Sequence, residues 1–497
     1  MKTRNSGILM HISSLPGTYG IGCFGEEAKR FIDFLAETGC TYWQVLPFGS
    51  TDDYNSPYAS VSAFAGNINF IDLRQLENLL TPAELEAQRC NNPYSADYGH
   101  LKHNRTNVLY QAYLRADGTL LAAATEYALE NSGWLSDYSL YVMIKEAQGG
   151  KPWFEWEDKY KFRDFAALEE VKEKYSDAVR FIEFCQYIFD FQWRKIRKYA
   201  AEKGISIIGD MPIYVSLDSA DVWSNRNLFD LNKDGFANNV AGVPPDYFAK
   251  DGQKWGQALY RWDVMKKDNY NWWTFRLRKT FELFDVVRID HFRAFSAYWA
   301  VPADSPTAKT GKWIDGPGYD FFETIFKHFS KERIIAEDLG EIDDRVRELL
   351  AKTELPGMRV MQFGFLDFSD NLHLPHNYPR NSFAYTGTHD NNTVLGWLWE
   401  ANPQQRGWAM EYCGFNGSDW AQGGSKSESV AAMINTLWRS SAKTVIVPIQ
   451  DLLGYGGDTR MNTPGVADGN WMFRITREQL EEIDAEKLKE MNRIFMR

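Results

Sequence analysis

Four acidic residues, each at the end of a short and mostly apolar run, are the side chains of this sequence best placed to do chemistry: Asp210, Asp290, Glu337 and Asp390. Two carboxyl groups that flank a glycosidic bond can break it with retention of configuration, because one attacks the anomeric carbon while the other protonates the leaving oxygen. A single acid of this kind could equally be a structural carboxylate. Four of them in one repeating pattern favour a catalytic site, provided that the fold brings them together.

The local sequence suggests different roles for two of these acids. Arg288 lies two residues before Asp290, so the two side chains share one face of an extended strand. We expect the positive charge to keep the pKa of Asp290 low, which suits a nucleophile. Glu337 follows the apolar residues 334–336, and apolar surroundings favour the protonated form that a general acid needs.

A third role falls to Asp390, which follows His389. We expect Asp390 to hold substrate hydroxyl groups and to stabilise an oxocarbenium-like transition state. His389 and His291 are expected to hydrogen-bond the substrate, with a histidine satisfied inside the core as the alternative. The eight histidines show no HExxH or other metal-ligand spacing, so neither a metal nor another cofactor is predicted.

Strands must position these acids, and eight short segments have the length and apolar character of buried strands: residues 7–12, 42–48, 205–213, 286–291, 334–340, 358–365, 383–390 and 444–451. Amphipathic helical stretches precede most of them: residues 26–38, 178–203, 271–284, 319–331, 343–352 and 427–440. This alternation predicts parallel strands and an α/β fold. Eight units fit a (β/α)8 TIM barrel better than an open doubly wound sheet, which would usually show a nucleotide-type switch point.

Two stretches are too long for plain connections between a strand and a helix. Residues 67–176 are mostly polar and helical in pattern, and residues 214–270 are rich in Gly, Asn, Asp and aromatic side chains. We expect a helical and a loop-rich insertion that form subdomains around the C-terminal face of the barrel, the second covering the active site. No repeat or Pro/Ser linker divides the chain, so residues 1–497 are predicted to form one elaborated domain.

The overall composition excludes several classes of protein. A net charge of −12 without a basic stripe argues against a nucleic-acid partner. Five scattered cysteines without a CxxC pair indicate neither a disulfide framework nor a zinc site, so we expect a cytoplasmic protein. No apolar run approaches 18 residues and residues 1–6 lead into no signal-peptide core, so no membrane association is predicted. The oligomeric state is left open.

Two short motifs are similar to other kinds of site. Residues 20–25 match the glycine pattern of a dinucleotide-binding loop, but residues 13–17 before them read as a turn and not as a strand. Residues 230–235 open like an EF-hand loop, yet the twelfth position is Ala241, where a bidentate Glu is required. We interpret both as ordinary loops.

Longer motifs resemble the 4-α-glucanotransferases known as amylomaltases or disproportionating enzymes, glycoside hydrolase family 77. They run in family order from end to end of the chain: residues 11–17 (HISSLPG), 19–22 (YGIG), 55–58 (NSPY), 209–215 (GDMPIYV), 241–248 (AGVPPDYF), 451–454 (DLLG) and 460–465 (RMNTPG). The resemblance implies a (β/α)8 barrel with inserted subdomains and a retaining double displacement. It also implies transfer of a segment of an α-1,4-glucan to the 4-hydroxyl of another glucan or of glucose.

The resemblance also implies residue roles and substrates. It assigns Asp290 as nucleophile, Glu337 as acid/base and Asp390 as transition-state stabiliser. The predicted substrate contacts are Arg288, His389, Tyr54, Asp246, Trp255, Asp210, His291 and Ser56, with Asp246 and Trp255 on a flexible loop over the acceptor side. The implied substrates are maltooligosaccharides, with starch and glycogen as larger candidates, and no cofactor is implied.

The sequence departs from the family pattern at two places. Cys23 stands where the family commonly has Asp, which leaves the catalytic acids untouched. Gln257-Ala258 stands where Asn-Pro is usual. Because proline fixes φ and alanine does not, the second departure bears on the stiffness of the covering loop and on acceptor preference.

Three other functions compete with glucan transfer. An α-amylase-like hydrolase shares the first half-reaction, so the carboxylates do not distinguish it from a transferase. The covering segment 242–256 favours transfer, because it would exclude water and bind an acceptor sugar. A binding protein without activity has no need of intact acids at positions 290, 337 and 390. An oxidoreductase built around residues 20–25 lacks the strand that its loop requires.

Overall fold

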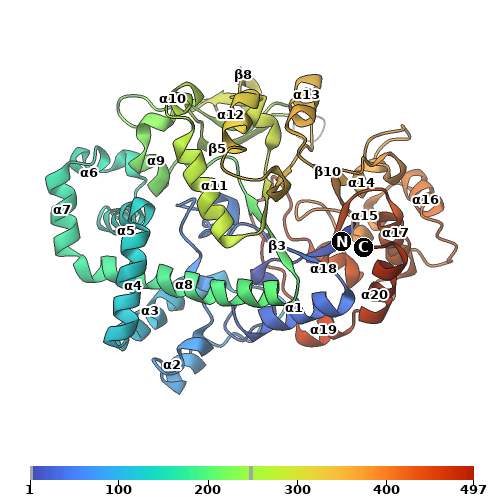
Figure 1. Ribbon diagram of the computed structural model, residues 1–497, viewed down its shortest axis with the longest axis horizontal. Coiled ribbons are helices and arrows are strands. Elements are labelled where there is room, and N and C mark those ends of the chain that lie inside the picture. Colours follow the sequence, from blue (N-terminus) through green and yellow to red (C-terminus); the bar gives the residue numbers. More distant parts are fainter. Residues whose placement is uncertain (1–3, 246–249) are drawn as a thin grey trace.

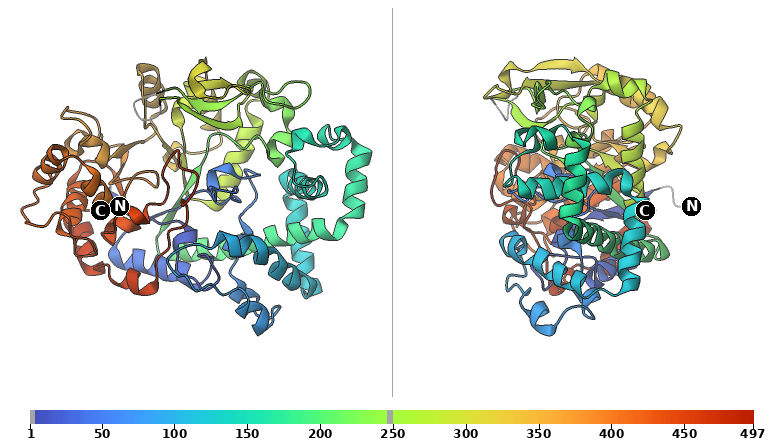
Figure 2. Two further views of the ribbon diagram at one scale, coloured as in Figure 1. Left: turned by 180° about the vertical axis from the view of Figure 1, so that it is seen from behind. Right: turned by 90° about the vertical axis from the view of Figure 1, so that its left-hand side faces the viewer.

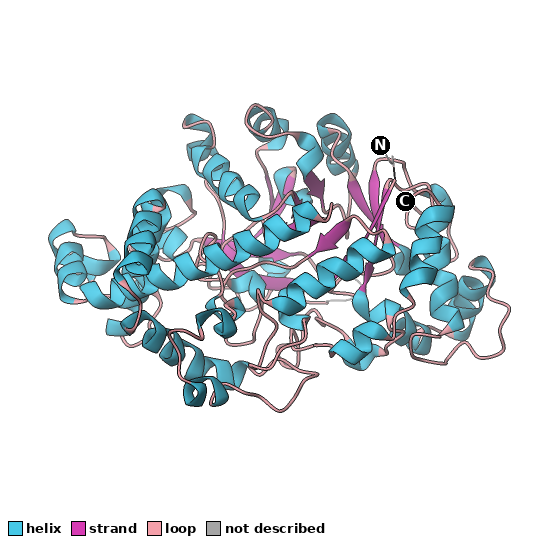
Figure 3. Ribbon diagram, turned by 60° about the horizontal axis from the view of Figure 1, so that its bottom comes forward, coloured by secondary structure: helices cyan, strands magenta, loops and turns pink. Residues whose placement is uncertain are grey.

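The computed structural model describes residues 4–245 and 250–497. At its centre, eight parallel strands curl into a barrel in the order β10-β11-β12-β1-β2-β3-β6-β9 (Figure 3). They are β1 (Asn5–Leu9), β2 (Tyr42–Gln44), β3 (Ser206–Met211), β6 (Val286–Ile289), β9 (Ile334–Ala336), β10 (Gly357–Val360), β11 (Ser382–Tyr385) and β12 (Thr444–Pro448). The Ala336 N–H donates to Pro356 O at 3.0 Å, which brings β9 to β10 and nearly closes the barrel. The predicted (β/α)8 architecture is confirmed.

Helices surround the strands, as Figure 3 shows. The longer helices that lie between consecutive barrel strands or follow the last one include α1 (Glu26–Thr38), α8 (Ser176–Glu202), α11 (Asn271–Leu283), α12 (Gly318–Ile325), α13 (Asp344–Thr353), α17 (Glu428–Arg439) and α20 (Ala485–Ile494). Helix α1 illustrates why they form: two glutamates lie in its first turn, and it ends at Gly39 in the left-handed region at φ 75°. None of the helices among the described residues is both long and apolar enough to cross a membrane.

A helical region separates β2 from β3. It contains α2 (Pro82–Glu86), α3 (Tyr98–Leu114), α4 (Gly118–Glu130), α5 (Ser132–Ala147), α6 (Asp158–Lys161) and α7 (Phe165–Lys174). In Figure 1 the helices α4 to α7 lie to the left, on the side away from the two chain termini. Helix α8 connects this region to the barrel: it packs against α4 and α5 at one end and against β3 and α1.

A second, antiparallel sheet lies at the top of Figure 1, over one side of the barrel. Its order is β5-β4-β7-β8, formed by β4 (Asn239–Val243), β5 (Gln253–Ala258), β7 (Ala297–Pro302) and β8 (Lys312–Asp315). Helices α9 (Ala220–Ser224) and α10 (Trp262–Lys267) flank β4 and β5 in the sequence. Because β7 and β8 come from the connection after β6, the sheet extends beyond the range 214–270 predicted for that insertion.

The C-terminal third completes the barrel. It adds α14 (Met361–Gly364), α15 (Val394–Glu400), α16 (Pro403–Tyr412), α18 (Ile449–Leu452) and α19 (Arg477–Glu481). All eight predicted strands run past the observed strand ends, and in 358–365 and 444–451 the excess residues belong to the helices at 361–364 and 449–452. A short apolar run does not distinguish a buried helical turn from a strand. The first and last described residues lie side by side near the C label of Figure 2, since Arg4 Nη1 donates to Phe495 O at 3.0 Å and Arg497 Nη1 donates to Asn5 O at 3.1 Å.

Candidate active site

Three neighbouring strands bring charged side chains to the C-terminal end of the barrel. Alternate residues of a strand share a face, and on β3, β6 and β9 the inward residues Ile208, Val286 and Ile335 belong to one apolar cluster. Two residues further along the same strands stand Asp210, Arg288 and Glu337. The strand register pairs Asp210 with Arg288 and Ile289 with Ala336. Asp290 and Glu337, which follow that last pair, therefore emerge side by side.

Arg288 is the centre of the charged layer. Its Nη1 donates to both carboxylate oxygens of Asp210 at 2.8 Å and lies 2.9 Å from Asp290 Oδ1. Its Nε lies 3.2 Å from Met358 Sδ. The side chains of Arg288 and Asp210 are almost completely buried, whereas that of Asp290 is 29 % exposed. Asp290 is thus the member of this group that a molecule in the cleft can reach.

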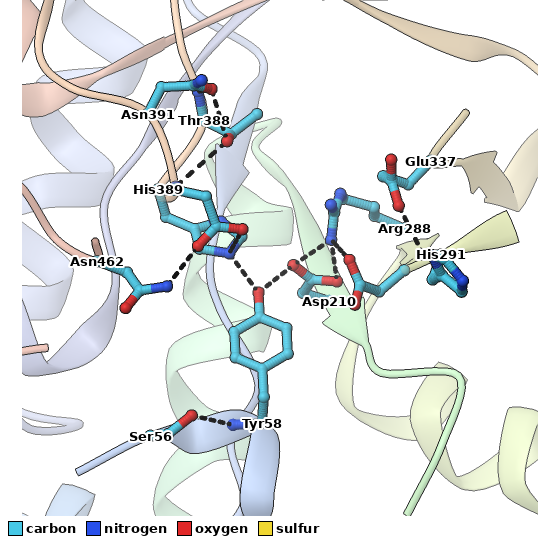
Figure 4. Close-up of polar contacts among 12 residues, drawn as sticks. Ser56, Tyr58, Asp210, Arg288, His291, Glu337, Thr388, His389, Asn391 and Asn462 are labelled. Carbon is cyan, nitrogen blue, oxygen red and sulfur yellow. Dashed lines mark hydrogen bonds and ion pairs between the residues drawn. The ribbon is translucent and has the colours of Figure 1, made fainter. Parts of the chain in front are cut away.

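Tyr58 connects the two halves of the site (Figure 4). Its hydroxyl donates to Asp210 Oδ2 at 2.7 Å and lies 2.9 Å from His389 Nε2. Because the single phenolic proton is given to Asp210, the tyrosine oxygen accepts from an Nε2–H of His389. The two rings are stacked, with centroids 5.3 Å apart, and Trp471 packs against both.

Asp390 lies beyond His389. Its Oδ2 is 3.3 Å from His389 Nε2, and its Oδ1 accepts from Asn462 Nδ2 at 2.6 Å. Arg460 donates to the Asp390 carbonyl. Burial acts to raise the pKa of Asp390, but the charge and hydrogen bond of His389 outweigh it and lower the pKa to about 2. For His389, burial acts downward and Asp390 upward, with a net rise in pKa. The two residues therefore form an ion pair.

Glu337 is held by two backbone N–H groups. His291 N donates to Oε2 and Leu339 N to Oε1, each at 2.7 Å. His291, whose N–H makes the first of these contacts, adopts the left-handed conformation (φ 54°, ψ 51°), which is uncommon for a residue with a side chain. Figure 4 shows this contact. Burial raises the pKa of Glu337 to about 7, against the effect of Arg288 and with a further contribution from the negative charge of Asp290. The raised pKa expected from the apolar approach to Glu337 is confirmed.

The expectation of a low pKa for Asp290 is wrong. Burial is the largest effect and raises the pKa to about 6, although Arg288 acts against it. The negative charges of Asp210 and Asp390 raise it further. Arg288 is shared between two carboxylates, so it does not compensate Asp290 alone. Asp290 and Glu337 are two carboxyl groups in one buried site, which disfavours the ionisation of both at once.

The remaining predicted contacts lie around this centre. Tyr54 is 55 % exposed, and Ser56 Oγ accepts from the Tyr58 N–H at the start of the short helix that carries Tyr58. The Trp255 ring packs edge-on against the His291 ring at 4.9 Å. Trp255 lies within strand β5, at an irregularity in the pairing of β5 with β4. Asp246 lies outside the described residues.

The structure also accounts for the other motifs that the sequence offered. Residues 20–25 form a loop packed against the turn at residues 12–15, where a Cβ on Gly22 would come within 1.9 Å of Ile12 O. Residues 230–235 belong to a turn closed by a bridge between Leu231 and Ala237. At the second family departure, Ala258 N donates to Val215 O at 3.1 Å, a bond that proline cannot make. Among residues 4–245 and 250–497, no group of three or more His, Cys, Asp or Glu side chains could hold a metal ion.

Several residues of the site were not predicted from the sequence. Tyr58 and Asn462 both belong to motifs quoted for the resemblance, but nothing local revealed their side-chain partners. Met358 and Trp471 look like ordinary core residues in the sequence. Only the position of Tyr58 beside a cluster of Gly, Asn and Ser offered a signal, because aromatic residues in loops often bind sugars.

Comparison with known proteins gives a consistent assignment. Residues 10–480 match the family described as 4-alpha-glucanotransferase. The chain is 42% identical to a 4-alpha-glucanotransferase of Streptococcus pneumoniae serotype 4 over 100% of its own length and 98% of the relative's. It is also 42% identical to a 4-alpha-glucanotransferase of Thermus thermophilus, over 98% of each chain. The structure of an amylomaltase from Streptococcus agalactiae in complex with acarbose superposes with a TM-score of 0.95 and 39% identity, over 99% of both chains. The chain therefore belongs to the 4-alpha-glucanotransferase family, whose members are enzymes that act on α-1,4-glucans.

Proposed function

We propose that this enzyme transfers a segment of an α-1,4-glucan to the 4-hydroxyl of a second glucan or of glucose by a retaining double displacement. The observation that carries the proposal is the pair of neighbouring strand ends on which Asp290 and Glu337 emerge side by side, one carboxyl reachable from the cleft and the other with a pKa raised by burial. Maltooligosaccharides are the proposed donors and acceptors, with starch and glycogen as larger ones.

In the first half-reaction, Asp290 is the nucleophile. The ion pair with Arg288 uses Oδ1, so Oδ2 is available to attack the anomeric carbon. As the new C–O bond forms, the glycosidic bond to the departing oxygen breaks, and Glu337 gives its proton to that oxygen. The N–H groups of His291 and Leu339 then stabilise the carboxylate that Glu337 becomes.

In the second half-reaction, the acceptor replaces the departed sugar. Its 4-hydroxyl attacks the anomeric carbon of the glycosyl ester, the bond to Asp290 breaks, and the hydroxyl proton passes to Glu337. Two inversions give net retention. Asp390, kept ionised by His389, is proposed to hold ring hydroxyls and to stabilise positive charge on the sugar in both steps.

The elements around the barrel supply the remaining contacts of the proposal. Arg288 and Asp210 are proposed to act on the reacting sugar through Asp290, and His389 through Asp390. Tyr54, Ser56, His291 and Trp255 are proposed to contact more distant glucose units. Asp246 is assigned to the acceptor side from the resemblance alone. We propose that residues 67–176 and 214–270 act as subdomains that wall the cleft. Their aromatic side chains are proposed to exclude water, which favours transfer over hydrolysis. Cys23, Cys90, Cys185 and Cys413 are free cysteines, which supports the proposed cytoplasmic site of action.

Incubation with maltotriose, without added metal or cofactor, tests the proposal. Chromatography over time should show free glucose together with a ladder of longer maltooligosaccharides. Glucose and maltose alone would identify a hydrolase and refute transfer. Unchanged maltotriose with sugar binding retained would refute catalysis altogether. The Asp290→Asn variant is the matched negative control for contaminating activity.

A further inference from the structure

The junction between β9 and β10, called the seam below, differs from the other strand junctions of the barrel. In the order β10-β11-β12-β1-β2-β3-β6-β9, each strand pairs with its neighbour through a backbone ladder, but β9 and β10, the two ends of that order, share none among the described residues. Among the described residues, one backbone hydrogen bond joins this part of the two strands, from Ala336 N to Pro356 O. The strand that leads into Glu337 is thus supported by a ladder on one side only.

Asp338, the residue after Glu337, spans this seam with its side chain. Oδ1 accepts from the backbone N–H of Met358 at 2.6 Å, and Oδ2 accepts from Arg359 Nη1 at 2.9 Å. The side chain is only 5 % exposed. Gly357 makes the approach possible, because a Cβ there would stand 2.7 Å from both Asp338 oxygens. The Asp338 carboxylate therefore accepts the Met358 N–H bond that a backbone carbonyl of β9 would accept in a regular ladder.

Asp338 directly precedes Leu339, one of the two residues whose N–H groups hold Glu337. Leu339, which follows Asp338, donates its N–H to Glu337 Oε1 at 2.7 Å. The orientation of the peptide between residues 338 and 339 therefore depends on where Asp338 is anchored. Met358 also contacts Arg288, through its Sδ atom at 3.2 Å from Nε. Arg288 is held in addition by both oxygens of Asp210, so a shift of Met358 should leave Arg288 in place.

We propose that Asp338 is a positioning residue for the reaction: by anchoring the end of β9 to β10, it holds the 337–339 segment so that Glu337 is aligned for proton transfer to the departing oxygen. The inference rests on the proposed acid/base role of Glu337. Asp338 itself, buried in the seam, does not touch the substrate. Its loss should impair the proton-transfer step selectively and leave the attack of Asp290 largely intact.

A purely structural role is the alternative, and the chain contains a matched control for it. Asp285 makes the same pair of bonds at the opposite end of the barrel: Oδ2 accepts from Ile207 N at 2.9 Å, and Oδ1 pairs with Arg197 Nη2 at 2.8 Å. Asp285 precedes β6 and so lies at the end away from Glu337. Both carboxylates join strands to an arginine, but only Asp338 adjoins the proposed acid.

The test compares Asp338→Asn, Asp285→Asn and Glu337→Gln on two donors, maltotriose and α-maltosyl fluoride. Fluoride needs little protonation to leave, and kcat/KM reports the steps up to the covalent intermediate for both donors. For Asp338→Asn we expect kcat/KM to fall on the order of 10- to 100-fold with maltotriose and less than about 3-fold with the fluoride, since misplacement by about 1 Å has this size of effect. Asp285→Asn should lower both values by the same small factor.

The pH profile provides a second reading. The Leu339 N–H favours the ionised form of Glu337, so its displacement raises the pKa of Glu337. The alkaline limb of kcat/KM should move to higher pH in Asp338→Asn and stay in place in Asp285→Asn. Equal losses on the two donors together with an unmoved limb would overturn the inference.

Two further variants cover the cases in which Asp338→Asn does not fold or Glu337 is not the acid. Gly357→Ala places a methyl group against the Asp338 carboxylate without removing a charge, so it should reproduce the donor-selective loss; if Asp338→Asn does not fold, this variant decides. Glu337→Gln distinguishes the two proposals. If Glu337→Gln shows no donor selectivity, the acid role of Glu337 fails; if it shows the selectivity and neither seam variant does, only the role of Asp338 fails.

Discussion

Removal of the Tyr58 hydroxyl is the perturbation whose consequence can be worked out most fully from the geometry. Tyr58→Phe deletes one donated bond, to Asp210 at 2.7 Å, and one accepted bond, from His389 at 2.9 Å. The ring keeps its stacking on His389 and its contact with Trp471, so the fold should be preserved. The change therefore acts on the electrostatics of the site.

The magnitude follows from the charge of the partner. A hydrogen bond to a charged group contributes about 1.5–3 kcal/mol, which corresponds to roughly 10- to 150-fold in kcat/KM if it is expressed fully in the transition state. Asp210 already raises the pKa of Asp290 through its negative charge. Without the tyrosine proton, that charge is less compensated, so the pKa of Asp290 rises further and the acid limb of kcat/KM moves to higher pH.

The assay is maltotriose disproportionation measured as initial glucose release across pH, with thermal unfolding as a check on folding. Tyr42→Phe is the control, because Tyr42 is a partly buried tyrosine packed against the apolar cluster inside the same barrel. Wild-type kcat/KM and an unmoved acid limb in Tyr58→Phe, with Tyr42→Phe also unchanged, would refute the coupling between Tyr58 and Asp290.

Three further outcomes follow from the proposed mechanism. Asp290→Asn should lower transfer by on the order of 10⁴-fold or more while maltoheptaose binding, measured by calorimetry, stays within a few-fold of wild type, since the amide cannot form the covalent ester; substantial activity in that variant would contradict the nucleophile assignment. Glu337→Gln should lower kcat/KM on the order of 100-fold or more with maltotriose and far less with α-maltosyl fluoride; equal losses would speak against an acid. In the wild-type enzyme, kcat/KM should be bell-shaped, because protonation of Asp290 at low pH removes the nucleophile, ionisation of Glu337 at high pH removes the acid, and burial raises the pKa of both groups; a rate that stays constant from pH 4 to 9 would refute this assignment.

Much of the architecture was predictable because its signals are local. Short apolar runs that alternate with helical stretches indicated buried parallel strands, and all eight predicted segments overlap barrel strands. The same runs end in the acids, and the pairing of Ile289 with Ala336 brings Asp290 and Glu337 together. The least accurate predictions were strand ends, where apolar residues such as Met361 and Ile449 begin helices instead.

The electrostatics were only partly predictable. The apolar residues before Glu337 correctly indicated a raised pKa. Reasoning from Arg288 alone gave the wrong direction for Asp290, because it omitted burial and the carboxylate of Asp210, which lies on a different strand. A charged group on a neighbouring strand contributes as well as one nearby in the sequence, and the sequence does not show which residues of neighbouring strands are charged.

The sequence by itself therefore determined the barrel, the acids at its strand ends and, through its motifs, the family. Only the tertiary structure decided how those acids are supported: Tyr58 bonds Asp210 across 152 residues of chain, Asn462 bonds Asp390 across 72, and Asp338 binds Arg359 across the seam of the barrel. The physical reason is that periodicity and strand ends are encoded by near neighbours, whereas a pKa or a side-chain orientation depends on every group within a few ångströms, and most of those groups reach the site from distant parts of the chain.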